Sequence, residues 1–243
     1  MLSKIYKLAF VKKYIPKPFF FLVKFFYHFL RYYNIIKIPY STNNSISFNN
    51  NNYYSNNYFI NKLNKTKIYL EYGSGNSTLI ADSKKKKIFS VEGDRNFFYH
   101  IKKKINSKKT SLTYYNLGVT EYGSYPIFLN FFKFFFRKNY INYAKDILSK
   151  LDKNNTLPDL ILVDGRFRML CIIFLYIFIK KNISKYRQKP IVIFDDFFNR
   201  NYYKEAHKFF YIKKYNNFGI LVGIKNNINN IENYILKYSL DPR

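Results

Sequence analysis

The sequence has no tryptophan, one cysteine and only 14 acidic residues among its 243 residues. The single Cys171 excludes an intramolecular disulfide bond and fits a reducing compartment, so we expect a cytoplasmic protein. Cys171 lies in the apolar run MLCIIFLYIFI, where a buried structural thiol is the expected role. No uncharged apolar run reaches the length of about 20 residues that a membrane-spanning helix needs, and the N-terminal region shows no small-residue cleavage site of a secretory signal.

The shortage of acidic residues leaves a formal net charge of +28, a value typical of nucleic-acid-binding proteins. However, 34 of the 42 basic residues are lysine and only 8 are arginine, the residue preferred for bidentate contacts to phosphate and guanine. Lysine, asparagine, isoleucine, phenylalanine and tyrosine are all abundant, as AT-rich codon usage would make them. We therefore favour a lysine-rich solvated surface, then an anionic membrane or anionic substrate, and nucleic acid last.

Residues 1–40 form a basic, aromatic unit, and a helix is expected from Pro18 onward. The basic residues of this helix recur near one face, and they are Lys17, Lys24, His28 and Arg31. The interpretation that we favour packs the helix on the main domain with this basic edge toward solvent. The alternative places the helix in a membrane interface, peripheral on the inner face, with its lysines reaching anionic headgroups.

Residues 61–225 alternate between apolar strand-like runs and helical runs, which predicts one doubly wound α/β domain with a Rossmann-like, mainly parallel sheet. The parallel strands are predicted at residues 67–72, 87–92, 111–116, 160–164 and 191–195. Helices are expected at residues 95–105, 140–151 and 167–180. Runs at 209–215 and 218–224 flank an Asn-Asn pair and predict an antiparallel hairpin, giving seven strands. Outside the domain, the Asn-rich residues 41–60 predict a linker and residues 226–243 a tail.

The stretch IYLEYGSGNSTLIADSKKKKIFSVEGD joins two of these strands through a glycine turn. Gly73 and Gly75 allow a tight turn and a close approach of a ligand to the backbone, and the N–H groups of the next helix would point at that ligand. Glu71 precedes the turn, and Glu92 follows the first glycine by roughly 20 residues, where an acid can bind ribose hydroxyls. The dinucleotide fingerprint asks for a third glycine where this chain has Thr78. The pattern therefore predicts a nucleoside site.

Acidic residues gather at the predicted carboxyl ends of the strands, where open α/β sheets bind their ligands. The residues expected at this edge are Glu71, Glu92, Asn116, Asp164, Asp195 and Asp196. Five of the 14 acidic residues are among them, which indicates a functional site in so basic a chain. The alternative role for Asp164 and Asp196 is capping of helix N-termini.

LEYGSGNST resembles motif I of the class I S-adenosylmethionine-dependent methyltransferases, in which an acid ends the first strand before the glycine turn. VDGRFR after the fourth strand and FDDFFNR after the fifth resemble a bacterial branch of that superfamily, over roughly residues 66–224. The predicted hairpin is similar to the sixth and seventh strands of that fold. The chain departs from the branch at Phe197, where tyrosine is usual, and at Asn76, where glycine is frequent.

The resemblance implies an S-adenosylmethionine-dependent enzyme that moves a methyl group to an oxygen of a small-molecule or glycan-like acceptor. It implies that the cofactor is contacted by Glu71, Gly73, Ser74, Gly75, Ser77, Glu92, Asn116 and Asp164. Among these, Glu92 would bind the ribose, Asn116 the adenine, and Asp164 would face the sulfonium. The catalytic residues expected are Asp164, Arg166 and Asp195.

Asp164, Asp195 and Asp196 also resemble the metal site of the catechol and caffeoyl-coenzyme A O-methyltransferases. Three carboxylates would suit Mg²⁺, which would lower the pKa of the acceptor hydroxyl. In the competing, metal-free interpretation, Arg166 and Arg168 pair with these acids or clamp an anionic acceptor, with Arg200 and Tyr203 nearby.

Two further hypotheses compete with a small-molecule methyltransferase. One is a binding module that keeps the nucleoside pocket without transferring methyl groups. The other is a nucleic-acid methyltransferase, but the Asn/Asp-Pro-Pro-aromatic motif of the amino-methylating enzymes is replaced here by Asp164-Gly165-Arg166-Phe167. Cytosine C5 chemistry needs a nucleophilic cysteine, and Cys171 lies in an apolar run.

Overall fold

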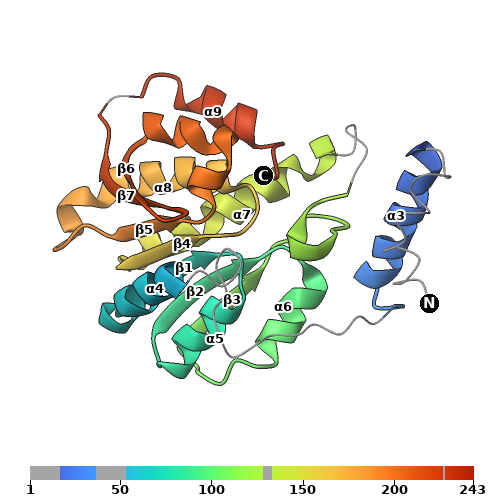
Figure 1. Ribbon diagram of the computed structural model, residues 1–243, viewed down its shortest axis with the longest axis horizontal. Coiled ribbons are helices and arrows are strands. Elements are labelled where there is room, and N and C mark those ends of the chain that lie inside the picture. The colour runs from blue at the N-terminus through green and yellow to red at the C-terminus, as the bar shows by residue number, and fades with distance from the viewer. Residues whose placement is uncertain (1–16, 37–52, 128–132, 227) are drawn as a thin grey trace.

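The computed structural model describes residues 17–36, 53–127, 133–226 and 228–243. Within them, seven strands form one sheet in the order β3-β2-β1-β4-β5-β7-β6 (Figure 1). The strands are β1 (Ile68–Tyr72), β2 (Lys87–Glu92), β3 (Thr110–Tyr114), β4 (Leu160–Val163), β5 (Ile191–Phe194), β6 (Phe210–Tyr215) and β7 (Phe218–Ile224). The first five pair in parallel, while β7 pairs antiparallel with both β5 and β6. The predicted mixed α/β sheet with its C-terminal hairpin is confirmed.

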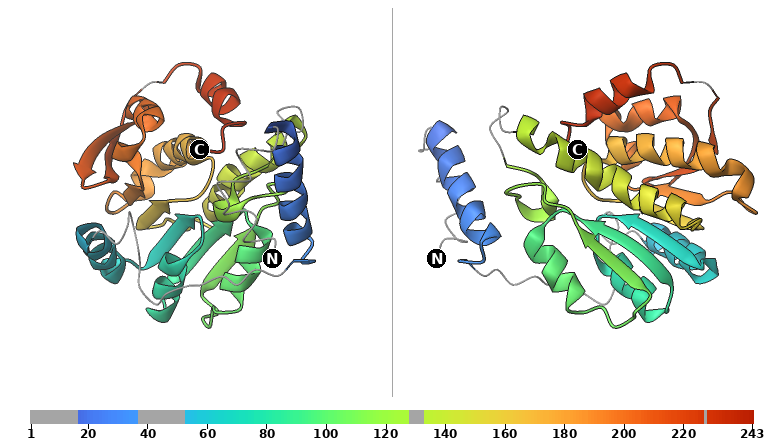
Figure 2. Two further views of the ribbon diagram at one scale, coloured as in Figure 1. Left: turned by 45° about the vertical axis from the view of Figure 1, so that its right-hand side comes forward. Right: turned by 180° about the vertical axis from the view of Figure 1, so that it is seen from behind.

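Helices cover both faces of the sheet (Figure 2). One face carries α4 (Tyr53–Lys65), α5 (Asn76–Ser83) and α6 (Arg95–Lys102), and the other carries α7 (Lys133–Lys153), α8 (Arg168–Asn182) and α9 (Ile231–Tyr238). The helix α3 (Lys17–Tyr32) stands beside the sheet, next to α6 (Figure 2). Short 3-10 turns include η1 (Tyr122–Ser124), η3 (Ile183–Lys185), η4 (Phe197–Asn199) and η5 (Asn201–Lys208). None of the helices in these described ranges is long and apolar enough to cross a membrane.

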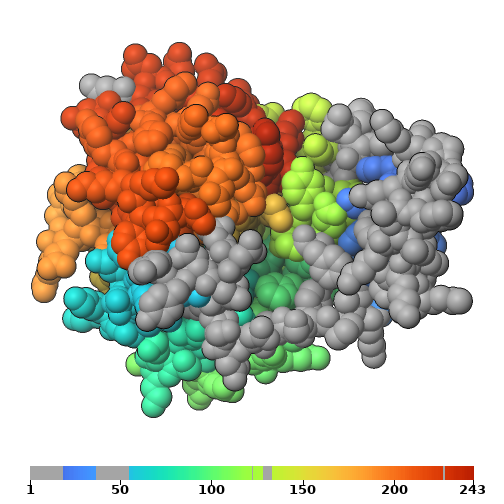
Figure 3. All heavy atoms as spheres, in the orientation of Figure 1, coloured from blue at the N-terminus to red at the C-terminus, as the bar shows by residue number. Residues whose placement is uncertain are grey.

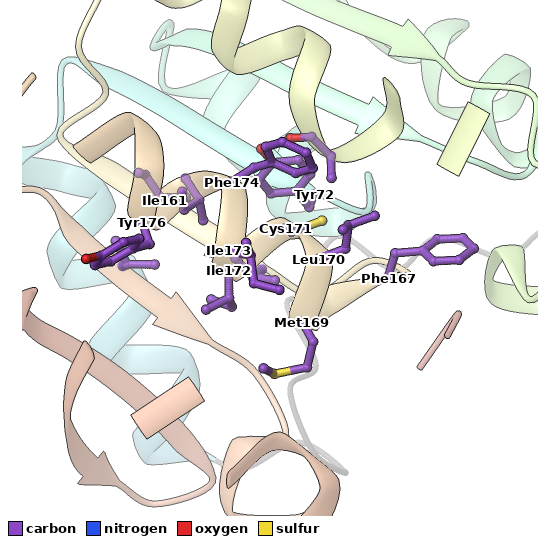
Figure 4. Packing of buried hydrophobic residues seen from close by; sticks show 14 of the residues in the cluster. Tyr72, Ile161, Phe167, Met169, Leu170, Cys171, Ile172, Ile173, Phe174 and Tyr176 are labelled. Carbon is purple, nitrogen blue, oxygen red and sulfur yellow. The ribbon is translucent and has the colours of Figure 1, made fainter. Parts of the chain in front are cut away.

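Alternation along the strands divides the core between the two faces. In β4, Leu160 and Leu162 pack toward α4, whereas Ile161 and Val163 pack toward α8. The helix α8 is buried on nearly all sides, which explains why its sequence is an unbroken apolar run. Figure 4 shows side chains of α8 leaving the helix in several directions, with Tyr72 of β1 near Cys171. Cys171 is a fully buried thiol, as expected.

Two boundaries differ from the sequence-based prediction. The helix α4 includes residues 53–60, which were predicted to be linker, and its Phe59 and Leu63 are fully buried against β1 and β2. Asparagine content concealed this helix because its fully buried residues, Ser55, Phe59 and Leu63, include only two large apolar side chains. Residues 41–52 of the predicted linker lie outside the described residues. At the other end, the predicted tail contains α9, which packs on α8.

The N-terminal helix α3 is oriented opposite to the interpretation favoured from sequence. Arg31 and His28, placed on the supposed solvent edge, are almost completely buried against the domain. Phe19, Leu22 and Phe26, on the apolar side, are exposed. The helix is therefore fastened by its polar residues, because the domain offers a buried carboxylate, Asp94, at that place. Residues 1–16 of the predicted N-terminal unit lie outside the described ranges.

Candidate functional site

The carboxyl edge of the parallel strands brings most of the predicted site residues together. Ladder hydrogen bonds align the strand ends, since Asp164 N donates to Tyr72 O at 3.0 Å and Asp195 N donates to Val163 O at 3.1 Å. Gly73 N likewise donates to Val91 O at 2.9 Å, which places the glycine turn beside the end of β2. The edge thus holds two acidic clusters, one around Glu92 and one around Asp164.

Gly73 and Gly165 form the contact between the two clusters. Gly73 has φ of +90°, a conformation that favours glycine, and a Cβ there would lie 2.7 Å from Gly165 Cα. A Cβ on Gly165 would in turn lie 2.8 Å from Gly73 N. Both glycines are needed because two backbone turns touch, so packing within the protein accounts for Gly73 without a ligand.

Gly75 differs from Gly73 in what surrounds it. Its φ is 177°, an extended value open to any residue, and a Cβ built there would meet no atom within 4 Å. Gly75 precedes the first turn of α5 and offers no side-chain cap to that helix. Its N–H donates to Thr78 Oγ1 at 2.9 Å, so the turn is held from within. The open space in front of Gly75, at a helix N-terminus, is where a ligand can approach the backbone.

Glu71 is fully buried and fixes the start of α5. Its Oε2 accepts hydrogen bonds from Tyr69 Oη at 2.8 Å and Ser77 Oγ at 2.7 Å, and its Oε1 accepts one from Thr78 Oγ1. Burial raises the pKa of Glu71, while the hydrogen bonds from Thr78 and Ser77 oppose that rise. Glu71 and Ser77 therefore hold the glycine turn and the start of α5 in place from the buried side. Their contact with a cofactor stays a prediction.

Glu92 is the acid that faces the glycine turn. Its Oε2 accepts from Ser74 N at 3.1 Å and Ser74 Oγ at 2.8 Å, while its Oε1 accepts from Gly93 N and Asp94 N, each at 2.8 Å. The hydroxyl of Ser124, in η1, also donates to Oε1. Burial raises the pKa of Glu92, and the bonds from Ser124 and Ser74 oppose this. Three backbone N–H groups hold the carboxylate in place, and the two hydroxyls are its only neutral side-chain donors among the described residues.

Asn116 lies farther out, just after β3, and its side chain is exposed. Its Oδ1 accepts from Gly118 N at 2.9 Å and from Tyr32 Oη of α3 at 3.3 Å. The neighbouring α3 thus borders the part of the edge where the adenine is predicted.

Arg168 occupies the centre of the second cluster. Its guanidinium lies 2.8 Å from Asp164 Oδ1, 3.7 Å from Asp196 Oδ2 and 4.0 Å from Asp195 Oδ2. It also donates to the backbone oxygen of Asp195 at 2.8 Å. Asp196 pairs in addition with Arg200 at 2.7 Å.

These contacts agree with ion pairing to arginine rather than with a metal site. No group of three or more His, Cys, Asp or Glu side chains in the described ranges is arranged to hold a metal ion. A cation already sits among Asp164, Asp195 and Asp196, and a divalent ion there would be repelled by it. The residues do not fit Mg²⁺, so the magnesium prediction is not carried further.

Asp195 is buried beside a second carboxyl group. Burial raises its pKa, and the neighbouring Asp164 adds to the rise while Arg168 opposes it. Asp164 has a side chain that is 35% exposed, against 7% for Asp195, so it is the carboxylate of this pair that reaches the crevice.

Arg166 connects the second cluster to the segment that carries Ser124. Its Nε donates to Gly123 O, and its guanidinium lies 5.3 Å from the centre of the Tyr125 ring. Burial lowers its pKa, and the nearby Arg168 lowers it further. No carboxylate of the described residues forms an ion pair with it.

Sequence reasoning missed two features of the site. Ser124 was not among the predicted site residues, and its contact with Glu92 spans 32 positions. The metal-free interpretation did predict that Arg168 pairs with the acids, and its guanidinium lies near all three of them. The C-terminal residues were called a tail, yet Pro242 O and Arg243 O accept hydrogen bonds from Phe167 N at 3.2 Å and Arg168 N at 3.1 Å. No local pattern indicates this last contact, because its partners lie 75 positions apart in the sequence.

Comparisons with known proteins bear on the fold. No protein-family model matches the sequence, and no curated protein matches it significantly. Among solved structures, the chain is similar to a methyltransferase-like protein from Silicibacter pomeroyi, with a TM-score of 0.57 and 20% sequence identity. The match covers 77% of this chain and 93% of that protein. At this identity the likeness establishes a shared fold.

Proposed function

We propose that this protein is a class I S-adenosylmethionine-dependent methyltransferase that methylates an oxygen of a small-molecule or glycan-like acceptor. The observation that carries the proposal is the open space at Gly75. Neither backbone conformation nor packing requires a glycine there, in contrast to Gly73. A ligand that approaches the backbone closely is the remaining physical reason for a missing side chain. The fold shared with a methyltransferase-like protein supports the same conclusion.

Glu92 suits a ribose because its hydroxyl donors are exchangeable. The backbone N–H groups of Ser74, Gly93 and Asp94 hold the carboxylate, whether or not a ligand is present. The hydroxyls of Ser74 and Ser124 each donate to one oxygen of Glu92, and two ribose hydroxyls would donate in their place. The two ribose hydroxyls would thus replace the two serine hydroxyls as donors to Glu92, and because all four are neutral the electrostatic cost would be small.

Asp164 and its neighbours would serve the acceptor. When bound, S-adenosylmethionine supplies a methyl group on a positively charged sulfur. As the acceptor oxygen bonds to that methyl carbon, the carbon–sulfur bond would break and its electron pair would stay on sulfur, which leaves S-adenosylhomocysteine. Asp164, the exposed carboxylate of the cluster, would take the proton that the acceptor oxygen loses. Arg168 holds the Asp164 carboxylate in position through a hydrogen bond of 2.8 Å. Arg166, free of any carboxylate among the described residues, would bind a negatively charged group of the acceptor.

The decisive experiment separates binding from turnover. Calorimetry with S-adenosylmethionine should detect binding to the wild-type protein, and Gly75→Val, whose side chain fills the open space, should abolish it without lowering the melting temperature. Release of S-adenosylhomocysteine in the presence of cell extract should then be seen for the wild type and be lost in Asp164→Asn. Binding without turnover in repeated extracts would favour the alternative, a non-catalytic nucleoside-binding module. Unchanged binding by Gly75→Val would refute the pocket itself.

A nucleic-acid methyltransferase is the weaker alternative. The second cluster holds aspartates paired with arginines, and Cys171 is fully buried with a pKa raised by burial, so it is no nucleophile. Tight DNA binding with a steep salt dependence would revive this alternative.

A further inference from the structure

The helix α3 presents an apolar stripe to solvent. Three large side chains of α3 at helical spacing, Phe19, Leu22 and Phe26, are 59% to 60% exposed, and Tyr33 and Ile35, just beyond the helix, are 55% and 67% exposed. Isolated exposed apolar residues are ordinary, but a contiguous stripe on one helix marks an interaction surface.

The opposite side of α3 is fastened to the domain by polar contacts. Arg31 forms a buried ion pair with Asp94, which caps the N-terminus of α6, and donates to Thr120 O at 3.4 Å. Asn96 Nδ2 donates to Arg31 O at 2.6 Å, and Lys24 pairs with Glu121 at 2.7 Å. These contacts fix the orientation of the helix. Because its polar side is bound to the domain, the apolar stripe faces outward.

A second apolar site lies at the same end of the molecule. The first turn of α7 exposes Phe134 and Phe135, at 62% and 70%. Figures 1 and 2 show the beginning of α7 at the end of the molecule where α3 stands. Lys133 and Lys138 flank these phenylalanines along α7. Aromatic side chains bordered by lysine are the composition of surfaces that enter the interface of a bilayer.

We infer that α3 and the start of α7 dock this protein on an anionic membrane, with the apolar stripe inserted among the lipid headgroups. Charge selects this occupant over a second copy of the chain, because two chains of +28 repel each other while an anionic bilayer attracts them. The residues preceding α3 in the sequence add Lys4, Lys7, Lys12 and Lys13 to the same end of the chain. The inference is independent of the proposed function, since it uses no residue of the two acidic clusters.

The absence of tryptophan makes insertion directly measurable. Phe26→Trp creates a single tryptophan in the stripe, and Tyr211→Trp creates a matched control. The two native side chains are equally exposed, at 60% and 58%, and Tyr211 lies on β6, at the far edge of the sheet from β3. Figure 3 shows α3, in blue, and the C-terminal strands, in orange, on opposite sides of the molecule.

The full chain is mixed with vesicles of phosphatidylglycerol and phosphatidylcholine, or of phosphatidylcholine alone. We expect the emission of Phe26→Trp to shift to the blue only with the anionic vesicles, while that of Tyr211→Trp stays unchanged. In vesicle sedimentation, the triple variant Phe19→Gln, Leu22→Gln, Phe26→Gln should bind at least tenfold more weakly than wild type, with unchanged circular dichroism.

Two outcomes would overturn the inference. An unchanged Phe26→Trp emission with every vesicle would show that the stripe does not insert. A blue-shifted emission already in buffer, unaffected by lipid, would show that another part of the chain, a second copy or a bound protein covers the stripe, and gel filtration would tell these apart.

Discussion

Two acidic clusters lie at one edge of the sheet, and their carboxylates are stabilised in different ways. Glu92 is surrounded by backbone N–H groups and by two hydroxyls, all of them neutral donors. Asp164, Asp195 and Asp196 surround the guanidinium of Arg168. Hydroxyl donors can be exchanged for those of a ligand, whereas a buried guanidinium cannot leave without stranding three acids. The first cluster is therefore suited to binding, and the second to holding one carboxylate in a fixed position.

The contact that joins the clusters should be the most sensitive to substitution. Gly73→Ala places a Cβ against the Gly165 backbone at a φ of +90°. The left-handed conformation costs about 2 kcal/mol, and overpacking adds up to about 3 kcal/mol. We expect chemical denaturation to show a loss of about 5 kcal/mol, or no folded protein. Gly75→Ala is the matched control and should leave the free energy of unfolding unchanged or slightly higher. Equal losses would contradict the distinction between the two glycines.

Removal of the central cation should be the next most damaging change. Arg168→Met leaves three acids around an uncharged side chain and should lower the free energy of unfolding by about 4 kcal/mol. Arg200→Met removes one partly exposed ion pair, with Asp196, and should cost less than about 1 kcal/mol. Urea denaturation of both variants measures the difference. Similar losses would mean that Arg168 is no more important to the second cluster than a surface arginine.

His28 of α3, a buried histidine outside both clusters, should make the stability of the protein depend on pH. The pKa of His28 in α3 is lowered to about 4 by burial and by Arg31 and Lys24. In the unfolded chain His28 takes up a proton near its ordinary pKa of 6.5, whereas in the folded protein it stays neutral until about pH 4. The stability that neutral His28 contributes is therefore present above pH 6.5 and is lost as the pH falls toward 4. The loss between pH 7 and pH 4 amounts to about 3 kcal/mol.

Denaturation across this pH range, wild type against His28→Asn, tests the point. The variant should show a shallower decline, whereas His207→Asn, an exposed histidine on η5, should follow the wild type. If the two variants behave alike, the acid sensitivity does not arise from His28.

The smallest effect is expected for substitutions at Glu92 and Ser124, which test whether ribose hydroxyls replace the hydroxyl donors to Glu92. Glu92→Gln should weaken S-adenosylmethionine binding about tenfold, or about 1.4 kcal/mol, because an amide accepts ribose hydrogen bonds less strongly than a carboxylate. Ser124→Ala removes a hydroxyl that competes for the same oxygen and should bind no more weakly than wild type. Calorimetry on the two variants measures the contrast. Weaker binding by Ser124→Ala would show that this hydroxyl contacts the ligand itself.

Particular residues show how far sequence reasoning reached. The strand at Lys87–Glu92 was predicted at its observed bounds, because a lysine run and a terminal acid delimit an apolar segment. The hairpin around Asn216 and Asn217 was also predicted, and Asn216 adopts the positive φ that such turns need. The helix α4 was missed because tertiary packing, rather than composition, stabilises it.

The structure places predicted site residues at one edge of the sheet, whereas their roles stay predictions and several of their contacts were not predicted. Glu92 and Asp164 lie at the expected edge, since parallel strands end together. Gly73 was assigned to a ligand, but the turn of Gly165, 92 positions away, explains it. A close approach between two turns has no local signature, so the sequence made Gly73 and Gly75 look alike.

Local chemistry determined the order of strands and helices, the glycine turn and the gathering of acids at one edge. These follow from periodicity, from turn conformations and from the rule that parallel strands share a direction. Only the tertiary structure decided between pairing and an anion clamp for Arg168, which lies among Asp164, Asp195 and Asp196. It alone also decided that Pro242 and Arg243 meet the start of α8 and that α3 turns its apolar side outward. Each depends on which groups, distant in the sequence, become neighbours. A buried charge or backbone N–H is costly without a partner, and only the folded structure determines which partner lies close enough.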